Sequence, residues 1–207
     1  MLVVDPRRDT DVYEDWLVRS GYRLRYILET HRNEDCLAGS LVLAERTGAE
    51  VWHTDRELDY QYGRPAEYGQ EWSLGNLRVR GVETPSHTPG HMSYLLHDQD
   101  GFPWALFSGD ALFAGGVSRT DLLGKEKVEE LTKQLYDSLH RRLLPLGDGV
   151  LLLPAHGPGS VCGTSWIANR RGVLGRGPAR LVLGRHVHGP DLLAGGRRSP
   201  AGSGKPT

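Results

Sequence analysis

The first 53 residues alternate between short apolar runs and stretches with helical spacing. Three short runs predict strands because they contain β-branched or aromatic residues and are bounded by turns. These are Leu2–Val4, Leu24–Thr30 and Val51–His53. Between them we expect helices over about 10–19, capped by Asp9 or Thr10, and over 36–47, each closed by a glycine. The first helix would place Val12, Trp16 and Leu17 on one face.

The rest of the chain to about residue 153 repeats this alternation. Residues 54–76 are polar and predict a loop with short strands, whereas three later apolar runs and one more near the end predict longer strands. These are Leu77–Val82, Met92–Leu96, Trp104–Phe107 and Val150–Leu153. The turn at 98–101 makes the second and third a hairpin. A helix is expected over Lys125–Leu143, and two batches of strands with helices between them predict two packed sheets with helices outside.

Histidine and aspartate side chains recur where the predicted strands end. The four stretches that show this pattern are 29–35, 84–91, 108–110 and 154–157. Imidazole and carboxylate groups on loops held by rigid strands are how proteins build metal sites. The sequence therefore predicts a metal site at one edge of the sheets.

Composition narrows the class of protein. At 207 residues the chain suits one domain, and no run approaches the ~20 apolar residues of a membrane span. Two cysteines cannot build a disulfide framework, so the expected location is the cytoplasm. The net charge of −1 divides into about +7 over residues 168–207 and −8 over 1–167, and an acidic body argues against nucleic acid as a partner.

Residues 168–207 form a Gly/Arg/Pro-rich tail without helical or strand periodicity. One interpretation is a basic segment for anionic partners; the favoured one is a disordered or non-native extension. The expected organisation is thus a domain over 1–167 followed by this tail.

Taken together, four motifs resemble the metallo-β-lactamase superfamily, within it most closely the persulfide dioxygenases (sulfur dioxygenases), relatives of glyoxalase II. The motifs are Thr84-Pro85-Ser86-His87, Ser108-Gly109-Asp110-Ala111-Leu112-Phe113, Ser118-Arg119-Thr120-Asp121 and Pro154-Ala155-His156-Gly157, the last followed by Cys162-Gly163. The resemblance covers about residues 1–166. It implies an α/β fold, the αββα sandwich, here without the strand hairpin that opens the family's domain.

The first metal loop departs from the family. The superfamily pattern is Thr-His-x-His-x-Asp-His, whereas this chain has Asn33 and Cys36 at the second and third histidine positions. A dinuclear zinc hydrolase uses the whole motif. Persulfide dioxygenases hold one iron by three residues, which the resemblance places at His31, His87 and Asp110. The departure therefore disfavours the dinuclear hydrolase but leaves all three ligands of the mononuclear centre in place.

Other residues of these motifs keep two interpretations each. By resemblance His156 is a ligand to a second metal; without that metal we expect a hydrogen-bond partner of the centre or a substrate contact. Asp35 is either a similar partner or a helix N-cap. Arg119 matches the family residue that holds glutathione, and the alternative is an ordinary salt bridge. His91 is expected to support the site rather than to bind metal.

The resemblance implies an enzyme with one Fe(II) per chain that oxidises glutathione persulfide, or a similar small persulfide, with O2 to sulfite and thiol. It also allows a homodimer and a rhodanese partner. The alternatives are a glyoxalase II-like Zn(II) thioesterase or another metallo-hydrolase of this fold, and an inactive truncated fragment.

Overall fold

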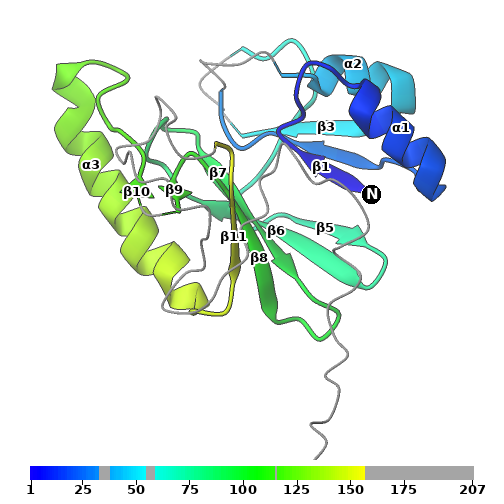
Figure 1. The fold of residues 1–207 in the computed structure, drawn as a ribbon. Helices are drawn as coiled ribbons and strands as arrows, with labels where there is room; N and C mark the ends of the chain where they lie inside the picture. Colours follow the sequence, from blue (N-terminus) through cyan, green and yellow to red (C-terminus); the bar gives the residue numbers. More distant parts are fainter. Residues whose placement is uncertain (33–37, 55–58, 115, 157–207) are drawn as a thin grey trace, which may run out of the picture.

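The computed structural model describes residues 1–32, 38–54, 59–114 and 116–156. Predictions that concern Asn33, Asp35, Cys36, the boundary at 167 and the tail lie outside this part of the chain. Within it, two sheets lie face to face, with α1 and α2 outside the first and α3 outside the second (Figure 1). The predicted αββα sandwich is confirmed.

The N-terminal sheet is built from parallel strands in the order β1-β2-β3-β4. Its elements along the chain are β1 (Leu2–Val4), α1 (Asp11–Ser20), β2 (Tyr26–Leu28), α2 (Ser40–Thr47), β3 (Glu50–His53) and β4 (Arg64–Pro65). The predicted strands are present, but α2 begins at Ser40 rather than at residue 36. Ala38 instead bridges Arg7, and the Gly39 amide donates to the Pro6 carbonyl at 2.8 Å.

The C-terminal sheet has the order β11-β8-β7-β6-β5, antiparallel except for the β11–β8 pair. Its strands are β5 (Glu71–Leu74), β6 (Leu77–Glu83), β7 (Met92–His97), β8 (Pro103–Gly109) and β11 (Leu151–Pro154), and β9 (Leu112–Phe113) and β10 (Gly116–Val117) form a small ribbon beside it. The predicted hairpin is the β7–β8 pair. Asp98 closes its turn by accepting from the amides of Asp100 and Phe102.

The long predicted helix is one helical stretch with three kinds of turn. The turns are η1 (Lys125–Lys127), α3 (Val128–Asp137), the π-helical η2 (Ser138–Leu143) and the short η3 (Leu144–Leu146) that follows. The predicted Glu129–Lys133 ion pair forms at 2.6 Å. No helix in the described part of the chain is both long enough and apolar enough to cross a membrane.

Three apolar clusters correspond to the three interfaces of the sandwich. One lies between the sheets, around Leu28, Trp72 and Tyr94. The others seat the helices on the outer faces, around Leu43 of α2 on the first sheet and around Leu106 of β8 in the second. These interfaces fix the sheets so that their loops meet at one edge.

The predicted face of α1 is right at Leu17 and wrong at Val12 and Trp16. Tyr13 and Leu17 pack against the first sheet, whereas Val12 and Trp16 remain 46% and 44% exposed. Both pairs have the i, i+4 spacing of a helical face, so the spacing alone left two choices. Trp16 instead stacks on Tyr22, with ring centroids 5.9 Å apart.

Candidate metal centre

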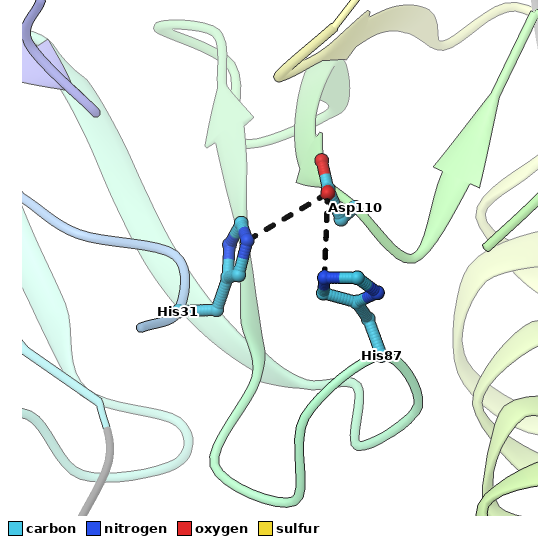
Figure 2. A group of neighbouring side chains, drawn as sticks. All are labelled: His31, His87 and Asp110. Atoms are coloured by element: carbon cyan, nitrogen blue, oxygen red, sulfur yellow. Dashed lines mark ion pairs between the residues drawn. The ribbon is translucent and has the colours of Figure 1, made fainter. Parts of the chain in front are cut away.

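Three predicted ligands meet at the edge where the two sheets join. His31 follows β2, His87 lies in the loop between β6 and β7, and Asp110 follows β8 directly. All three side chains are buried. Figure 2 shows them pointing toward one another from three separate loops. Residues 79 positions apart in the chain thus form one polar cluster inside the protein.

The distances in this cluster suit a metal ion. The Nε2 atoms of His31 and His87 each lie 3.7 Å from Asp110 Oδ2, and one ligand atom from each residue lies within 4.8 Å of the others. Bonds of about 2.1 Å place two ligand atoms about 3.4 Å apart in a tetrahedral site. The two separations of 3.7 Å between the imidazoles and Asp110 lie close to this value.

Asp110 is ionised despite its burial. Burial alone would raise the pKa of Asp110, but His156, His31 and His87 together hold that pKa well below its ordinary value. Both carboxylate oxygens are buried, and three imidazole nitrogens face Oδ2, those of His156, His31 and His87, at 3.4, 3.7 and 3.7 Å. A buried carboxylate surrounded by imidazoles suits a bound cation. The residues present therefore fit a metal ion, and they could hold one.

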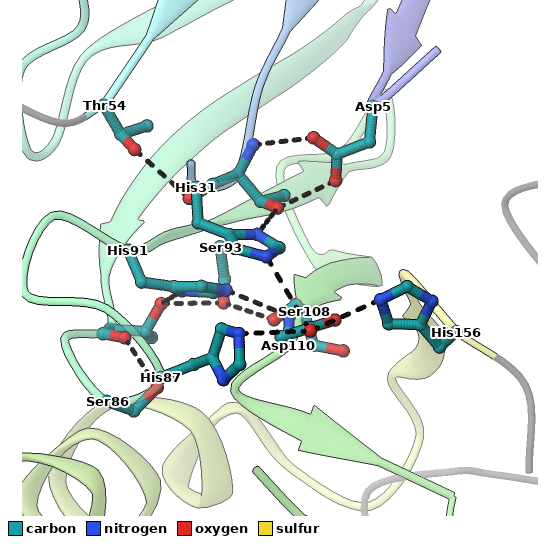
Figure 3. Close-up of polar contacts among 12 residues, drawn as sticks. Asp5, His31, Thr54, Ser86, His87, His91, Ser93, Ser108, Asp110 and His156 are labelled. Atoms are coloured by element: carbon teal, nitrogen blue, oxygen red, sulfur yellow. Dashed lines mark hydrogen bonds and ion pairs between the residues drawn. The ribbon is translucent and has the colours of Figure 1, made fainter. Parts of the chain in front are cut away.

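The environment of His31 selects one of its two tautomers. Thr30 donates its backbone amide and its hydroxyl to the carboxylate of Asp5, each at 2.8 Å (Figure 3). When Asp5 is ionised, the Thr30 hydroxyl proton points to its carboxylate, and Thr30 Oγ1 accepts from His31 Nδ1 at 2.7 Å. The proton of His31 therefore sits on Nδ1, which leaves Nε2 with a lone pair directed toward Asp110.

His91 lies beside this cluster but uses both nitrogens for the protein. Its Nε2 accepts the backbone amide of Asp110 at 3.0 Å, and its Nδ1 lies 2.8 Å from Thr84 Oγ1. Burial, and then the neighbouring His31, hold the pKa of His91 well below its ordinary value. A neutral ring with both nitrogens occupied agrees with the predicted supporting role.

His156 approaches the centre from the opposite side of Asp110. Its Nε2 lies 3.4 Å from Asp110 Oδ2, but it is not part of the three-residue cluster. Asp110 thus stands between two imidazoles on one side and one on the other (Figure 3). Asp35, the other residue predicted on the second side, lies outside the described residues.

Arg119 has an exposed side chain beyond β10. Its guanidinium forms a two-pronged contact with the carboxylate of Asp121, at 2.7 and 3.0 Å. The salt bridge that the sequence left as an alternative therefore exists.

Sequence reasoning missed Asp5 as a part of the site, whereas Gly109 belongs to a motif that it identified. Asp5 directly follows β1, which pairs in parallel with β2, so both strand ends meet at one edge. An acidic residue after a short apolar run was the available sign. Gly109 has a φ of 53°, and a Cβ there would lie 2.5 Å from His91 Nε2 and 2.7 Å from Thr30 Oγ1.

Comparisons with known proteins agree with this geometry. The model of the metallo-beta-lactamase superfamily matches residues 2–156. The chain is 24% identical to the hydroxyacylglutathione hydrolase GloC of Haemophilus influenzae, over 75% of this chain and 79% of the relative. It is 30% identical to the mitochondrial persulfide dioxygenase ETHE1 of Bos taurus, over 75% of this chain and 58% of the relative.

Solved structures show the same fold. The structure of ETHE1 from Myxococcus xanthus has a TM-score of 0.65 and 31% identity, covering 80% of this chain and 68% of the other. A metallo-beta-lactamase from Staphylococcus aureus has a TM-score of 0.69 and 29% identity, covering 79% of this chain and 50% of the other. With the family model spanning the sandwich and the cluster at its edge, the chain belongs to the metallo-beta-lactamase superfamily.

Proposed function

We propose that this chain is a mononuclear iron persulfide dioxygenase, which oxidises glutathione persulfide or a similar small persulfide to sulfite and thiol. The observation that carries the proposal is the cluster of two imidazoles and one carboxylate formed by His31, His87 and Asp110. Two histidines and one carboxylate with open positions are typical of ferrous oxygenase centres.

The sequence of the first metal loop supports one metal rather than two. Asn33 and Cys36 stand where a dinuclear hydrolase of this superfamily has histidines. Asn is a poor substitute for imidazole on zinc, and His156 approaches Asp110 without joining the cluster. The three proposed ligands of a single metal are therefore present, whereas the residues that would bind a second metal are altered.

A ferrous ion held by His31, His87 and Asp110 would supply redox-active Lewis-acid chemistry for the reaction of a persulfide with O2. The overall reaction is RSSH + O2 + H2O → RSH + SO3²⁻ + 2H⁺. The terminal sulfur loses four electrons and O2 gains them, so no further oxidant or reductant is needed. The bond between the two sulfur atoms breaks, and the inner sulfur leaves as the thiol.

The protein residues fix geometry and exclude water. The proton on His31 Nδ1 keeps its Nε2 available as a ligand, and the low pKa of Asp110 keeps that ligand anionic. Burial of all three side chains shields the centre from bulk solvent. Arg119, exposed and oriented by Asp121, would hold a carboxylate of the substrate.

One solved structure of this fold holds iron. Persulfide dioxygenases occur among the relatives and the solved structures, and a protein named TTHA1623, 28% identical with a TM-score of 0.58, was solved in a di-iron-bound form. These similarities make the proposed metal reasonable for this donor set.

A zinc thioesterase is the second candidate. A hydroxyacylglutathione hydrolase of Halorhodospira halophila is 40% identical over 56% of this chain and 43% of the relative. The position of His156, 3.4 Å from Asp110 Oδ2, also suits a ligand on the far side of a shared carboxylate. This candidate requires a second metal bound without the two missing histidines.

Parallel assays distinguish the two candidates. The protein, prepared without oxygen, is given glutathione persulfide in an oxygen electrode and, separately, a glutathione thioester. We expect O2 uptake matched one to one by sulfite, abolished by His31→Ala and retained by the control His140→Ala on the surface of η2. Thioester hydrolysis without persulfide-dependent O2 uptake would overturn the proposal.

A further inference from the structure

His91 is buried beside the proposed ligands but is not part of the cluster of His31, His87 and Asp110. It precedes β7, its side chain has no exposed surface, and its ring centroid lies 5.1 Å from that of His31. A third imidazole so close to a metal site would ordinarily compete for the metal. Here both of its nitrogens are engaged in hydrogen bonds within the protein.

The direction of these hydrogen bonds follows from one donor. The backbone amide of Asp110 can only donate, so His91 Nε2, 3.0 Å away, must be the acceptor. The ring proton therefore sits on Nδ1 and is donated to Thr84 Oγ1 at 2.8 Å. His91 is fixed as the neutral Nδ1-H tautomer.

The chain of hydrogen bonds then returns to the same turn. Thr84 keeps its own hydroxyl proton to donate to Ser93 Oγ at 2.9 Å, and Ser93 donates to the carbonyl of Ser108 at 3.3 Å. The series begins at the amide of Asp110 and ends two residues earlier in the chain (Figure 3). It therefore holds the Ser108–Asp110 turn on both sides of Gly109.

Gly109 shows how tightly the turn is held against His91. Its φ of 53° lies in the left-handed region, and an added Cβ would lie 2.5 Å from His91 Nε2. No side chain fits between the turn and the ring. The imidazole of His91 therefore both packs against the backbone that carries Asp110 and accepts a hydrogen bond from it.

We infer that His91 is a positioning residue, which holds the carboxylate of Asp110 in place for the metal by accepting the Asp110 amide. The inference rests on the proposed metal site. Asp110 Oδ2 is the atom that His31, His87 and His156 all approach, at 3.7, 3.7 and 3.4 Å. A metal site requires its ligands within about 0.5 Å of the productive geometry, so movement of this turn changes the whole centre.

Two matched substitutions separate the two nitrogens of His91. The amide oxygen of His91→Gln can replace Nε2 as an acceptor for Asp110, whereas the amide group of His91→Asn reaches only the position of Nδ1. The apparent affinity for Fe(II) is measured by competition with a chelator under nitrogen. We expect His91→Gln to stay within about threefold of the wild type and His91→Asn to lose 10–100-fold.

A second measurement needs no metal and no variant. Long-range ¹H–¹⁵N correlation spectra of the metal-free protein report which ring nitrogen carries the proton, and we expect Nδ1-H for His91. An Nε2-H tautomer would overturn the inference, and so would equal Fe(II) affinities for the two variants. If the wild type binds iron but does not oxidise persulfide, the proposed function fails while the role of His91 stands.

Discussion

The two sheets support the proposed ligands in different ways. The N-terminal sheet consists of parallel strands of two to four residues, and α1, which covers it, has no buried residue. The C-terminal sheet contains antiparallel strands of up to seven residues joined by hairpins. His31 comes from the first sheet, whereas His87 and Asp110 come from the second. The proposed metal site therefore lies between the N-terminal sheet, which has short strands, and the C-terminal sheet, which has longer ones.

The difference shows that His31 depends on contacts from outside its own strand. The Thr30 carbonyl accepts from the Met92 amide at 2.8 Å and from the Thr54 hydroxyl at 3.2 Å, and Tyr94 donates to the Glu29 carbonyl at 2.8 Å. Asp5 adds its carboxylate from the end of β1. His87 and Asp110, in contrast, lie on loops that the neighbouring strands β6, β7 and β8 hold directly.

The largest expected effect concerns the stability that Asp5 contributes next to Thr30 and how that stability depends on pH. Burial raises the pKa of Asp5 to about 7, well above the ordinary value of an aspartate. The folded state therefore binds this proton more tightly than the unfolded chain, so the stability that Asp5 contributes is full below pH about 4 and is lost as pH rises through 7. Three pKa units correspond to about 4 kcal/mol.

Asp5→Asn should remove this slope in the metal-free protein. Asn suits the site because Asp5 has a φ of 47°, a left-handed conformation that Asn tolerates. Urea denaturation from pH 4 to 8 measures the slope, with Asp98→Asn in the distant hairpin turn as the control. An unchanged decline in Asp5→Asn would contradict this assignment.

Disrupting the packing of the Gly109 turn against His91 should lower the free energy of unfolding by somewhat less. Gly109→Ala places a Cβ against His91 and Thr30 at a positive φ, and we expect a loss of about 3 kcal/mol in the free energy of unfolding. Gly101→Ala in the β7–β8 turn is the matched control, because it has a φ of 84° with open space around it. We expect about 1 kcal/mol there. Equal losses would show that backbone strain alone, without packing against His91, decides the cost.

Metal binding should stabilise the N-terminal sheet against the C-terminal sheet, because the proposed ligands come from both. A ligand that binds only the folded state adds about 2.7 kcal/mol of stability at 100 times its dissociation constant. Hydrogen exchange with and without Fe(II), under nitrogen, should show the larger gain of protection in β2, which leads to His31. His31→Ala should lose this gain in the N-terminal sheet. Added protection confined to the C-terminal sheet would refute the bridging role.

The smallest effect concerns a contact between η2 and the loop of His87. Ser138 in the π-helical turn donates to the carbonyl of Pro85 at 2.9 Å. Ser138→Ala should lower stability by about 1 kcal/mol and weaken metal binding through His87. Ser20→Ala, which removes a 3.3 Å bond to Leu17 on α1, is the control for stability and should leave metal binding unchanged. The reverse order of metal affinities would argue against the contact.

Local patterns in the sequence predicted most of the C-terminal sheet, because alternation and a turn specify a hairpin within a short stretch. The three converging ligands were predicted from strand ends and from the family resemblance. Asp5 was not, since it lies 25 residues from Thr30 and meets it only through a parallel strand pair. The face of α1 also depended on tertiary packing, because two apolar pairs had the same spacing.

The single-metal assignment can be tested by counting the metal ions bound per chain. The protein is loaded with excess Fe(II) without oxygen, freed of loose metal, and measured by elemental analysis against protein concentration. We expect one iron per chain, lost in His87→Ala and in Asp110→Ala but kept in His140→Ala. Two ions per chain, or an unchanged content in His87→Ala, would contradict the assignment of a single metal to His31, His87 and Asp110.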